Sequence, residues 1–126
     1  MLGSHPLVGF VGVSDVERAR AFYGDVLGLR LTSEWPGGCV FDAGGTTLRV
    51  TLVDAPAGAG YTVLGWTVGD IAAVVGELGG RGVAFERYEG LPQDELGVWQ
   101  TPDGSRVAWF KDPDANVLSV TQLVAT

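Results

Sequence analysis

The chain has 126 residues, 46% of them hydrophobic, and a formal net charge of −7. This length suits one compact domain, and the single cysteine, Cys39, excludes an internal disulfide. The acidic balance argues against a nucleic-acid partner and leaves a neutral or cationic small molecule as a compatible ligand. The sequence shows neither a membrane-spanning run nor a signal-peptide pattern, so we expect a cytoplasmic protein with no membrane partner.

The first predicted elements are a strand and a helix. Residues 8–13 (VGFVGV) are typical of a strand. Ser14 and Glu17 then have the Ser-x-x-Glu spacing of a capping box, which predicts that a helix begins there. Gly28 is placed to end the helix in a left-handed cap. Apolar residues recur between these ends at helical spacing, at Val16, Ala19, Phe22, Tyr23, Val26 and Leu27.

Three further strands are predicted in the first half, at about residues 30–35, 38–41 and 46–53. The stretches WPGG and DAGG separate them and supply the Pro, Gly and Asp that tight turns require. The first half of the chain therefore has the order β-α-β-β-β.

The second half repeats this order. Residues 63–68 are predicted to form a strand, and Asp70, which lies 55 residues after Asp15, is the predicted N-cap of a second helix. Strands are then predicted at residues 84–88, 106–111 and 117–123. An insertion, EGLPQDELGVWQTPDG, interrupts the second half, where the first half has only a few residues.

This repeat predicts one domain, residues 1–126, with a first module at about 7–54, a linker at 55–61 and a second module at about 62–124. A sheet with one helix leaves its other face exposed, so each module needs a partner. We therefore expect an α+β fold in which the two βαβββ modules form a curved, partly closed mixed sheet around a cavity, with the helices outside.

Three stretches, VSDVERARAFYGDVLGL, LGWTVGDI and PDGSRVAWFKDPDANVLSV, together with the paired layout, resemble the vicinal oxygen chelate superfamily. That group includes glyoxalase I, extradiol dioxygenases, fosfomycin-resistance enzymes and bleomycin-resistance proteins. The resemblance runs from about Val8 to Leu123. It implies the fold, a bacterial protein and a homodimer, but it leaves the function open because the superfamily hosts unrelated chemistries.

The resemblance also identifies the positions where metal-dependent members carry their ligands. Those members have a His or Gln on the first strand of each module and a Glu on the last strand. Here the first-strand positions hold Val8 and Val63, and the last-strand positions hold Arg49 and Ser119. Valine and arginine offer no lone pair, and a single serine is a poor ligand. The only histidine, His5, belongs to an N-terminal tail, so we expect no metal and no cofactor.

The same positions predict the lining of a ligand cavity, because alternate residues of a strand share a face. Alternation adds Phe10, Gly12, Thr51, Gly65, Thr67, Val117 and Thr121 to this lining. Arg49 has two interpretations. It either binds the ligand, through a carboxylate or an aromatic ring, or it points outward or pairs with a local carboxylate such as Glu34.

The aromatic residues divide into core and rim. Phe22, Tyr23, Trp66 and Phe85 are predicted core residues, whereas flat rings at the rim would suit a planar ligand. Gln93, Asp94 and Glu95 are predicted to form an acidic rim. The predicted ligand-binding residues are Val8, Phe10, Glu34, Trp35, Arg49, Thr51, Val63, Thr67, Tyr88, Trp99, Trp109, Ser119 and Thr121.

Two classes of function remain. The favoured class is a metal-independent binder that resembles the bleomycin-resistance branch and sequesters a drug or an aromatic metabolite. The alternative is a lyase, an isomerase or a dioxygenase of the superfamily. Such an enzyme would use Arg49 as electrostatic stabiliser with Glu34 or Glu95 as base, or it would hold a metal through ligands at other positions.

Overall fold

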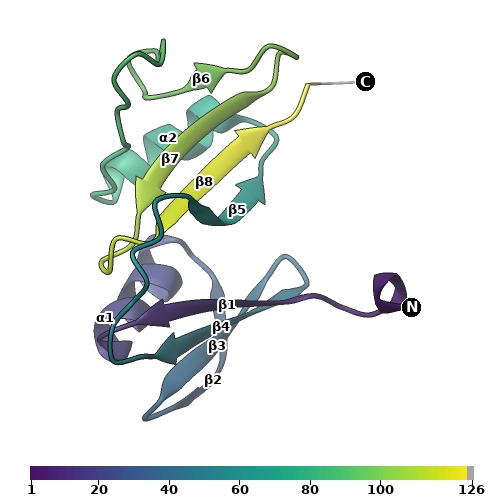
Figure 1. The fold of residues 1–126 in the computed structure, drawn as a ribbon, viewed down its shortest axis with the longest axis vertical. Coiled ribbons are helices and arrows are strands. Elements are labelled where there is room, and N and C mark those ends of the chain that lie inside the picture. The colour runs from purple at the N-terminus through teal and green to yellow at the C-terminus, as the bar shows by residue number, and fades with distance from the viewer. Residues whose placement is uncertain (125–126) are drawn as a thin grey trace. The chain divides into compact units, whose positions relative to one another are not determined.

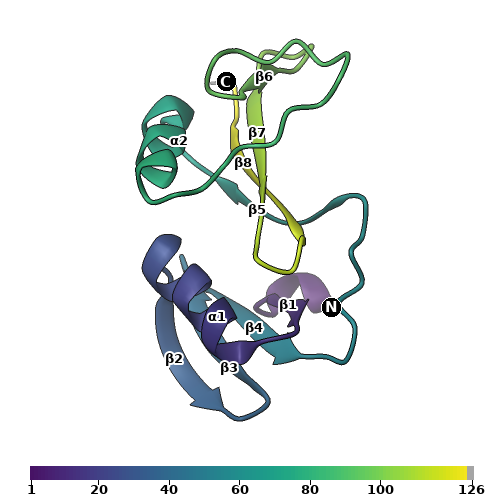
Figure 2. The ribbon, with the colours of Figure 1, turned by 90° about the vertical axis from the view of Figure 1, so that its left-hand side faces the viewer.

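The computed structural model describes residues 1–124, which form two units that divide between Gly58 and Ala59. This division falls within the segment predicted as a linker, residues 55–61. Each unit is a four-stranded mixed sheet with a helix on one face (Figures 1 and 2). The predicted α+β class is therefore confirmed.

Unit 1 has the strand order β1-β4-β3-β2, in which β1 runs parallel to β4 and the other neighbours are antiparallel. Its elements are η1 (Leu2–Ser4), β1 (Val8–Val13), α1 (Val16–Arg20), η2 (Ala21–Val26), β2 (Arg30–Trp35), β3 (Gly38–Ala43) and β4 (Thr46–Leu52).

The helix of unit 1 begins one residue later than the sequence predicts. Its N-cap is Asp15, whose Oδ1 accepts the backbone N–H of Arg18 at 3.0 Å. The predicted capping box at Ser14 is wrong, because the carboxylate of the adjacent Asp15 accepts the free N–H at the start of the helix. The Ser14 Oγ instead accepts a hydrogen bond from the Arg18 guanidinium. The helix continues as the π-helical turn η2 and ends at Gly28, whose φ of 77° is the predicted left-handed cap.

The core of unit 1 follows the alternation of its central strands. Val11 and Val13 of β1 and Leu48 and Val50 of β4 are at most 4% exposed, and α1 contacts β3 and β4. Burying each such side chain contributes about 1.5 to 3 kcal/mol to folding. The residues between them face the opposite side of the sheet, which no helix covers (Figure 2).

Unit 2 has the equivalent strand order β5-β8-β7-β6, again with its first strand parallel to its last. Its elements are β5 (Thr62–Thr67), α2 (Ile71–Gly80), β6 (Trp99–Gln100), β7 (Arg106–Lys111) and β8 (Val117–Gln122). Asp70 caps α2 as predicted, since its Oδ1 accepts the N–H of Ala73 at 3.1 Å. Neither α2 nor any other helix within residues 1–124 has the length and apolarity needed to cross a bilayer.

The strand predicted at residues 84–88 is wrong. Only Phe85 forms a β-bridge there, to Phe110 of β7, and the edge of the sheet is instead taken by the short strand β6. Apart from this bridge and a second one between Gln93 and Trp99 of β6, residues 84–98 run as a loop that the inserted segment extends.

The side chain of Gln93 explains why this segment is not a regular strand. Its Oε1 accepts the N–H of Tyr88 at 2.7 Å, and its Nε2 donates to the carbonyls of Glu86 and Gly97, both at 2.9 Å. Backbone groups that would otherwise need a neighbouring strand are thus satisfied by one amide. This loop positions Tyr88 beside the sheet.

The turn between β7 and β8 is held by a buried carboxylate. Asp112 is 4% exposed, and its Oδ1 accepts the N–H groups of Asp114 and Asn116 at 2.9 and 2.8 Å. Its Oδ2 accepts the Asn116 side-chain amide at 2.8 Å. The DPDAN stretch is therefore the turn that its composition predicts, and it fixes the register of the two strands that carry Trp109 and Ser119.

Candidate ligand-binding site

The helix-free face of unit 1 brings together four of the predicted site residues. Phe10 of β1 lies directly opposite Arg49 of β4, and Thr51 lies two residues further along β4. Val8 precedes Phe10 by two positions and so points to the same side. Phe10 and Val8 are 64% and 43% exposed in this structure, so this face of the edge strand β1 presents large apolar side chains to solvent.

Trp35 joins this face from β2 and lies against Arg49. The guanidinium carbon of Arg49 is 5.3 Å from the centre of the Trp35 ring, which is a cation–π contact. Gly38, the partner of Trp35 in β3, leaves the space that the ring needs. A Cβ at Gly38 would lie 3.2 Å from the ring and would collide with the carbonyl of Val50.

Glu34 does not belong to this face. Adjacent residues of a strand point to opposite sides, and Glu34 is paired with the buried Cys39, whereas Trp35 is paired with Gly38. Its Oε2 lies 3.4 Å from the Nε of Arg20 in α1. The hypothesis that Arg49 pairs with Glu34 is therefore wrong.

The Arg20–Glu34 pair instead lines a separate open pocket of about 440 Å³ at the edge of unit 1. Its lining residues are Val16, Glu17, Arg20, Glu34, Trp35 and Pro36. Behind it, burial raises the pKa of the Cys39 thiol, the charge of Glu34 adds to this effect, and Arg20 opposes it. Cys39 is therefore a core residue and not a nucleophile.

The helix-free face of unit 2 carries most of the remaining predicted residues. Gly65 of β5 and Trp109 of β7 both pair with Ser119 of β8, and Thr67 pairs with Thr121. All of them alternate with the buried residues that pack beneath α2, such as Leu118. Val63 is the exception in this unit, because β5 has a bulge between Thr62 and Leu64 that leaves it without a register partner.

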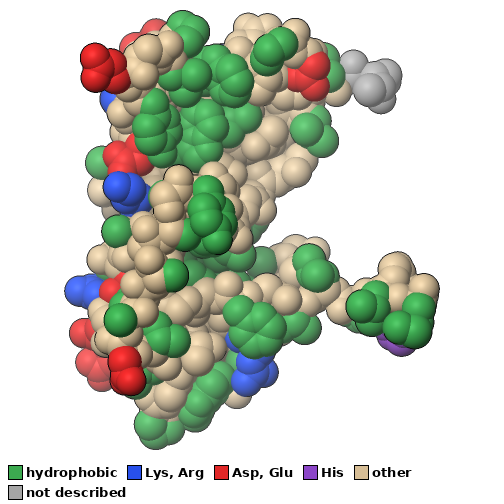
Figure 3. Space-filling view, in the orientation of Figure 1, with side chains coloured by type: hydrophobic (Ala, Val, Ile, Leu, Met, Phe, Trp, Pro, Cys, Tyr) green, Lys and Arg blue, Asp and Glu red, His purple; other side chains and the backbone are tan. Residues whose placement is uncertain are grey.

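Three aromatic residues gather on this face, and we call Tyr88, Trp99 and Trp109 the aromatic cluster. The rings of Trp99 and Trp109 stack with their centres 6.2 Å apart and an interplanar angle of 26°. Tyr88 meets Trp109 edge-on at 5.4 Å and is 41% exposed. Figure 3 shows hydrophobic side chains exposed together over this part of the molecule. Such flat, partly exposed rings are suited to stacking with a planar molecule.

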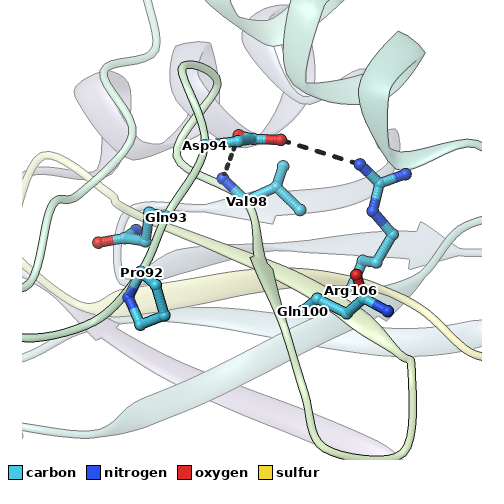
Figure 4. Close-up of a pocket in the computed structure, with 6 residues that line it drawn as sticks. All are labelled: Pro92, Gln93, Asp94, Val98, Gln100 and Arg106. Carbon is cyan, nitrogen blue, oxygen red and sulfur yellow. Dashed lines mark hydrogen bonds and ion pairs between the residues drawn. The ribbon is translucent and has the colours of Figure 1, made fainter.

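The predicted acidic rim has a different role. Asp94 holds its own loop, because its Oδ1 accepts the N–H of Val98 at 2.9 Å, and its Oδ2 lies 3.8 Å from the Nη2 of Arg106 (Figure 4). The carbonyls of Asp94 and Glu95 accept the Arg87 guanidinium at 2.6 and 2.8 Å. The Asp94 carboxylate is thus held by its own loop and by Arg106, whereas Glu95 contributes its backbone carbonyl.

These residues border a second open pocket, of about 320 Å³, that sequence reasoning missed. It is lined by Pro92, Gln93, Asp94, Val98, Gln100 and Arg106 (Figure 4). Gln100 and Arg106 pair with each other and alternate with Trp99 and Val107. The pocket therefore lies on the side of β6 and β7 opposite the aromatic cluster. In the sequence, the pocket is indicated by nothing more than the alternation of Trp99 and Gln100 in the short strand β6.

The residues at the family's metal-ligand positions do not fit a metal ion. Val8 and Val63 have no donor atom, and Arg49 brings a permanent positive charge to the place of a carboxylate. Ser119 is buried, with its Oγ close against Gly65. Within residues 1–124 the structure also brings no three His, Cys, Asp or Glu side chains together in a cluster that could hold a metal ion.

Two βαβββ modules, each with a helix on one face and candidate ligand contacts on the other, define a protein of the paired-βαβββ class. The chain belongs to the Glyoxalase/Bleomycin resistance protein/Dioxygenase superfamily, whose family model matches residues 5–120. The resemblance drawn from the sequence is confirmed. The comparison with curated proteins finds no match.

Solved structures agree on the fold. A superfamily member from Sphaerobacter thermophilus DSM 20745 is 24% identical, with a TM-score of 0.76 over 98% of this chain and 100% of that chain. A lactoylglutathione lyase from Agrobacterium tumefaciens is 21% identical, with a TM-score of 0.73 over 94% and 93%. TnmS3, an antibiotic binding protein from Streptomyces sp. CB03234, is 30% identical, with a TM-score of 0.70 over 98% and 99%.

Proposed function

We propose that this protein is a metal-independent binder that sequesters a planar aromatic small molecule, such as an antibiotic or an aromatic metabolite. The observation that carries the proposal is the aromatic cluster, in which Tyr88, Trp99 and Trp109 leave ring surface exposed on a sheet face that no helix covers. The similarity to TnmS3, an antibiotic binding protein, supports the same class of function.

The arrangement of carboxylates favours a binder over an enzyme. A metal-free reaction at Arg49 would need a base beside it, yet Glu34 lies on the other side of the sheet and pairs with Arg20. Stacking and shape, by contrast, need no titratable group.

We also propose that the protein is a bacterial, cytoplasmic homodimer. The buried, unpaired thiol of Cys39 is compatible with a reducing compartment. β1 is an edge strand of its sheet and exposes large apolar side chains, with Phe10 64% and Val8 43% exposed. Light scattering should give twice the mass of one chain, and Phe10→Lys should shift the protein to monomer. A wild-type protein that is monomeric at micromolar concentration contradicts the dimer.

Calorimetric titration with a neutral, flat probe, 2-aminoanthraquinone, tests the binding function. The wild type should bind the probe, and Trp109→Ala should weaken binding by about ten-fold, because one stacking partner is lost and the other two rings lose their support. Trp66→Phe is the matched control, since Trp66 lies on the helix side of the same sheet and pairs with Val120 of the core. The proposal fails if the wild type does not bind, or if both variants bind as the wild type does.

A further inference from the structure

Arg49 differs from every other basic side chain of the protein. All eight Lys and Arg residues lie within the described residues 1–124, and seven of them have a hydrogen-bond or ion-pair partner. Five are paired with carboxylates, as Arg20–Glu34, Arg30–Asp42, Arg81–Glu77, Arg106–Asp94 and Lys111–Glu86. Arg18 donates to Ser14, and Arg87 donates to the loop carbonyls. Among residues 1–124, Arg49 alone has only a ring beneath it.

The surroundings of Arg49 make this arrangement unfavourable unless a ligand completes it. Its neighbours across the strands are Phe10 on one side and Val40 on the other, and its own side chain is partly buried. A guanidinium that is partly dehydrated among apolar groups loses hydration free energy. Pairing with an anion or with hydrogen-bond acceptors compensates for this loss. Trp35 covers one face of the guanidinium at 5.3 Å, and a cation–π contact does not use the N–H groups along its edge.

We infer that Arg49 and Trp35 form a site on the helix-free face of unit 1 that recognises an anionic group, so that the ligand bound there is an aromatic molecule carrying a carboxylate or an ionised phenol. The inference rests on the proposed binding function and specifies its ligand. A carboxylate matches the planar fork of the guanidinium and accepts two N–H groups at once. A ligand bound at Arg49 is therefore anionic, in contrast to the neutral or cationic ligand with which the net charge of the chain is compatible.

One negative charge fits this face better than two. The other arginine in the described strands of this sheet, Arg30, lies 3.5 Å from Asp42, whose charge offsets its own. A phosphate dianion needs more than one cation or a set of backbone N–H groups, whereas a carboxylate or phenolate needs only Arg49. The indole of Trp35 then supports the ring to which that group is attached.

A pair of matched probes tests this inference, namely 2-naphthoate and its neutral isostere 2-naphthamide. Binding is measured by NMR titration at neutral pH, with the Arg49 Nε–H and Trp35 Nε1–H signals as local reporters. We expect naphthoate to shift both signals and to bind about ten-fold more tightly than the amide, the ratio that a charge-assisted hydrogen bond supplies. Arg49→Gln should abolish the difference between the two probes.

Arg30→Gln is the matched control. It removes one positive charge from the same sheet, but from a side chain that is 72% exposed and already paired with Asp42, so the preference for naphthoate should remain. Arg49→Lys separates charge from geometry, because it keeps the charge and loses the fork, and it should retain only part of the preference. The inference is overturned if naphthoate leaves both reporter signals unshifted, if the two probes bind equally, or if Arg30→Gln and Arg49→Gln reduce the preference equally.

These outcomes separate the inference from the proposed function. A protein that binds 2-aminoanthraquinone through Trp109 and shows no preference for naphthoate keeps the binding function and refutes the role of Arg49. A protein that prefers naphthoate through Arg49 and does not bind 2-aminoanthraquinone has the anion site without the aromatic binding function.

Discussion

Gly65 and Ser119 lie so close across the parallel β5–β8 pair that a Cβ at Gly65 would be 2.7 Å from the Ser119 Oγ. Real Cβ atoms do not approach other heavy atoms to this distance. The glycine therefore allows the buried Ser119 hydroxyl to occupy the position that corresponds to Arg49 in the first module. The two modules differ here, with a tightly packed hydroxyl in one and a guanidinium in the other.

This contact predicts that Gly65→Ala destabilises the protein by about 1 to 3 kcal/mol, the usual cost of overpacking. Ser119→Ala removes the Oγ and should cost little by itself. In the double variant the new methyl group has room, so the loss should be smaller than the sum of the two single losses. Urea unfolding of the four proteins measures this coupling. Strict additivity would show that the two residues are not in contact.

Strand alternation allowed much of the candidate site to be predicted. Starting from the family's ligand positions Val8 and Arg49, alternation added Phe10 and Thr51, and the structure places these four residues on one face of unit 1. Glu34 and Trp35 were both assigned to the site, although neighbours in one strand cannot share a face. Distance in the sequence misled here, since Glu34 lies near Trp35 in the chain but pairs with Arg20 of the helix.

The second module was predicted less well, because the side chain of Gln93 takes the place of strand pairing for the backbone of residues 84–88. Nothing in the local pattern of residues 84–88 shows that Gln93 will hold the backbone at Tyr88 and Glu86. The result is a loop that brings Tyr88 to Trp109, a contact that depends on the fold of the insertion and not on strand alternation. The aromatic cluster could therefore be named residue by residue, but its geometry could not be derived.

Gln93→Ala should consequently destabilise unit 2 by about 1 to 3 kcal/mol, because three backbone groups, two of them in partly buried hydrogen bonds, lose their partner together. Amide hydrogen exchange should accelerate at Tyr88, whose N–H is bound by Gln93. Gln100→Ala is the matched control, since Gln100 is exposed on β6 and its side chain has no such contacts. Equal stability of the two variants would remove Gln93 as the residue that organises the loop.

The two candidate caps of α1 give a further test. Asp15→Ala should cost about 1 kcal/mol, because it removes the acceptor of the Arg18 N–H and a negative charge at the helix N-terminus. Ser14→Ala, one residue earlier, should cost less than Asp15→Ala, since its bond to the Arg18 side chain is exposed and it removes no helix cap. Thermal unfolding of both variants decides the question, and a larger loss for Ser14→Ala would restore the capping box that the sequence predicts.

The buried thiol of Cys39 predicts that the free energy of unfolding decreases at alkaline pH. Burial raises the pKa of its thiol above the ordinary value of about 8.5, so the native state holds the proton where the unfolded chain releases it. The stability that this contributes is complete below the ordinary pKa and is lost as the pH rises toward the raised one. Urea midpoints should therefore fall more steeply at alkaline pH in the wild type than in Cys39→Ala. Rapid reaction of the native thiol with a disulfide reagent at pH 8 would contradict the burial on which this argument depends.

The last prediction concerns metal. The purified protein should contain far less than one transition-metal ion per chain, and a chelator should leave its melting temperature unchanged. The physical reason is the chemistry of the family's ligand positions, where Val8 and Val63 provide hydrocarbon and Arg49 provides a cation. Arg49→Glu restores one carboxylate to β4 but should not create tight zinc binding, because one donor is too few.

Val8→His with Arg49→Glu places two donors on neighbouring strands of one sheet face and should bind zinc measurably better than Arg49→Glu alone. Elemental analysis of the wild type that finds one zinc, iron, nickel or manganese ion per chain would refute the prediction, and it would show that the ligands come from residues other than these four positions.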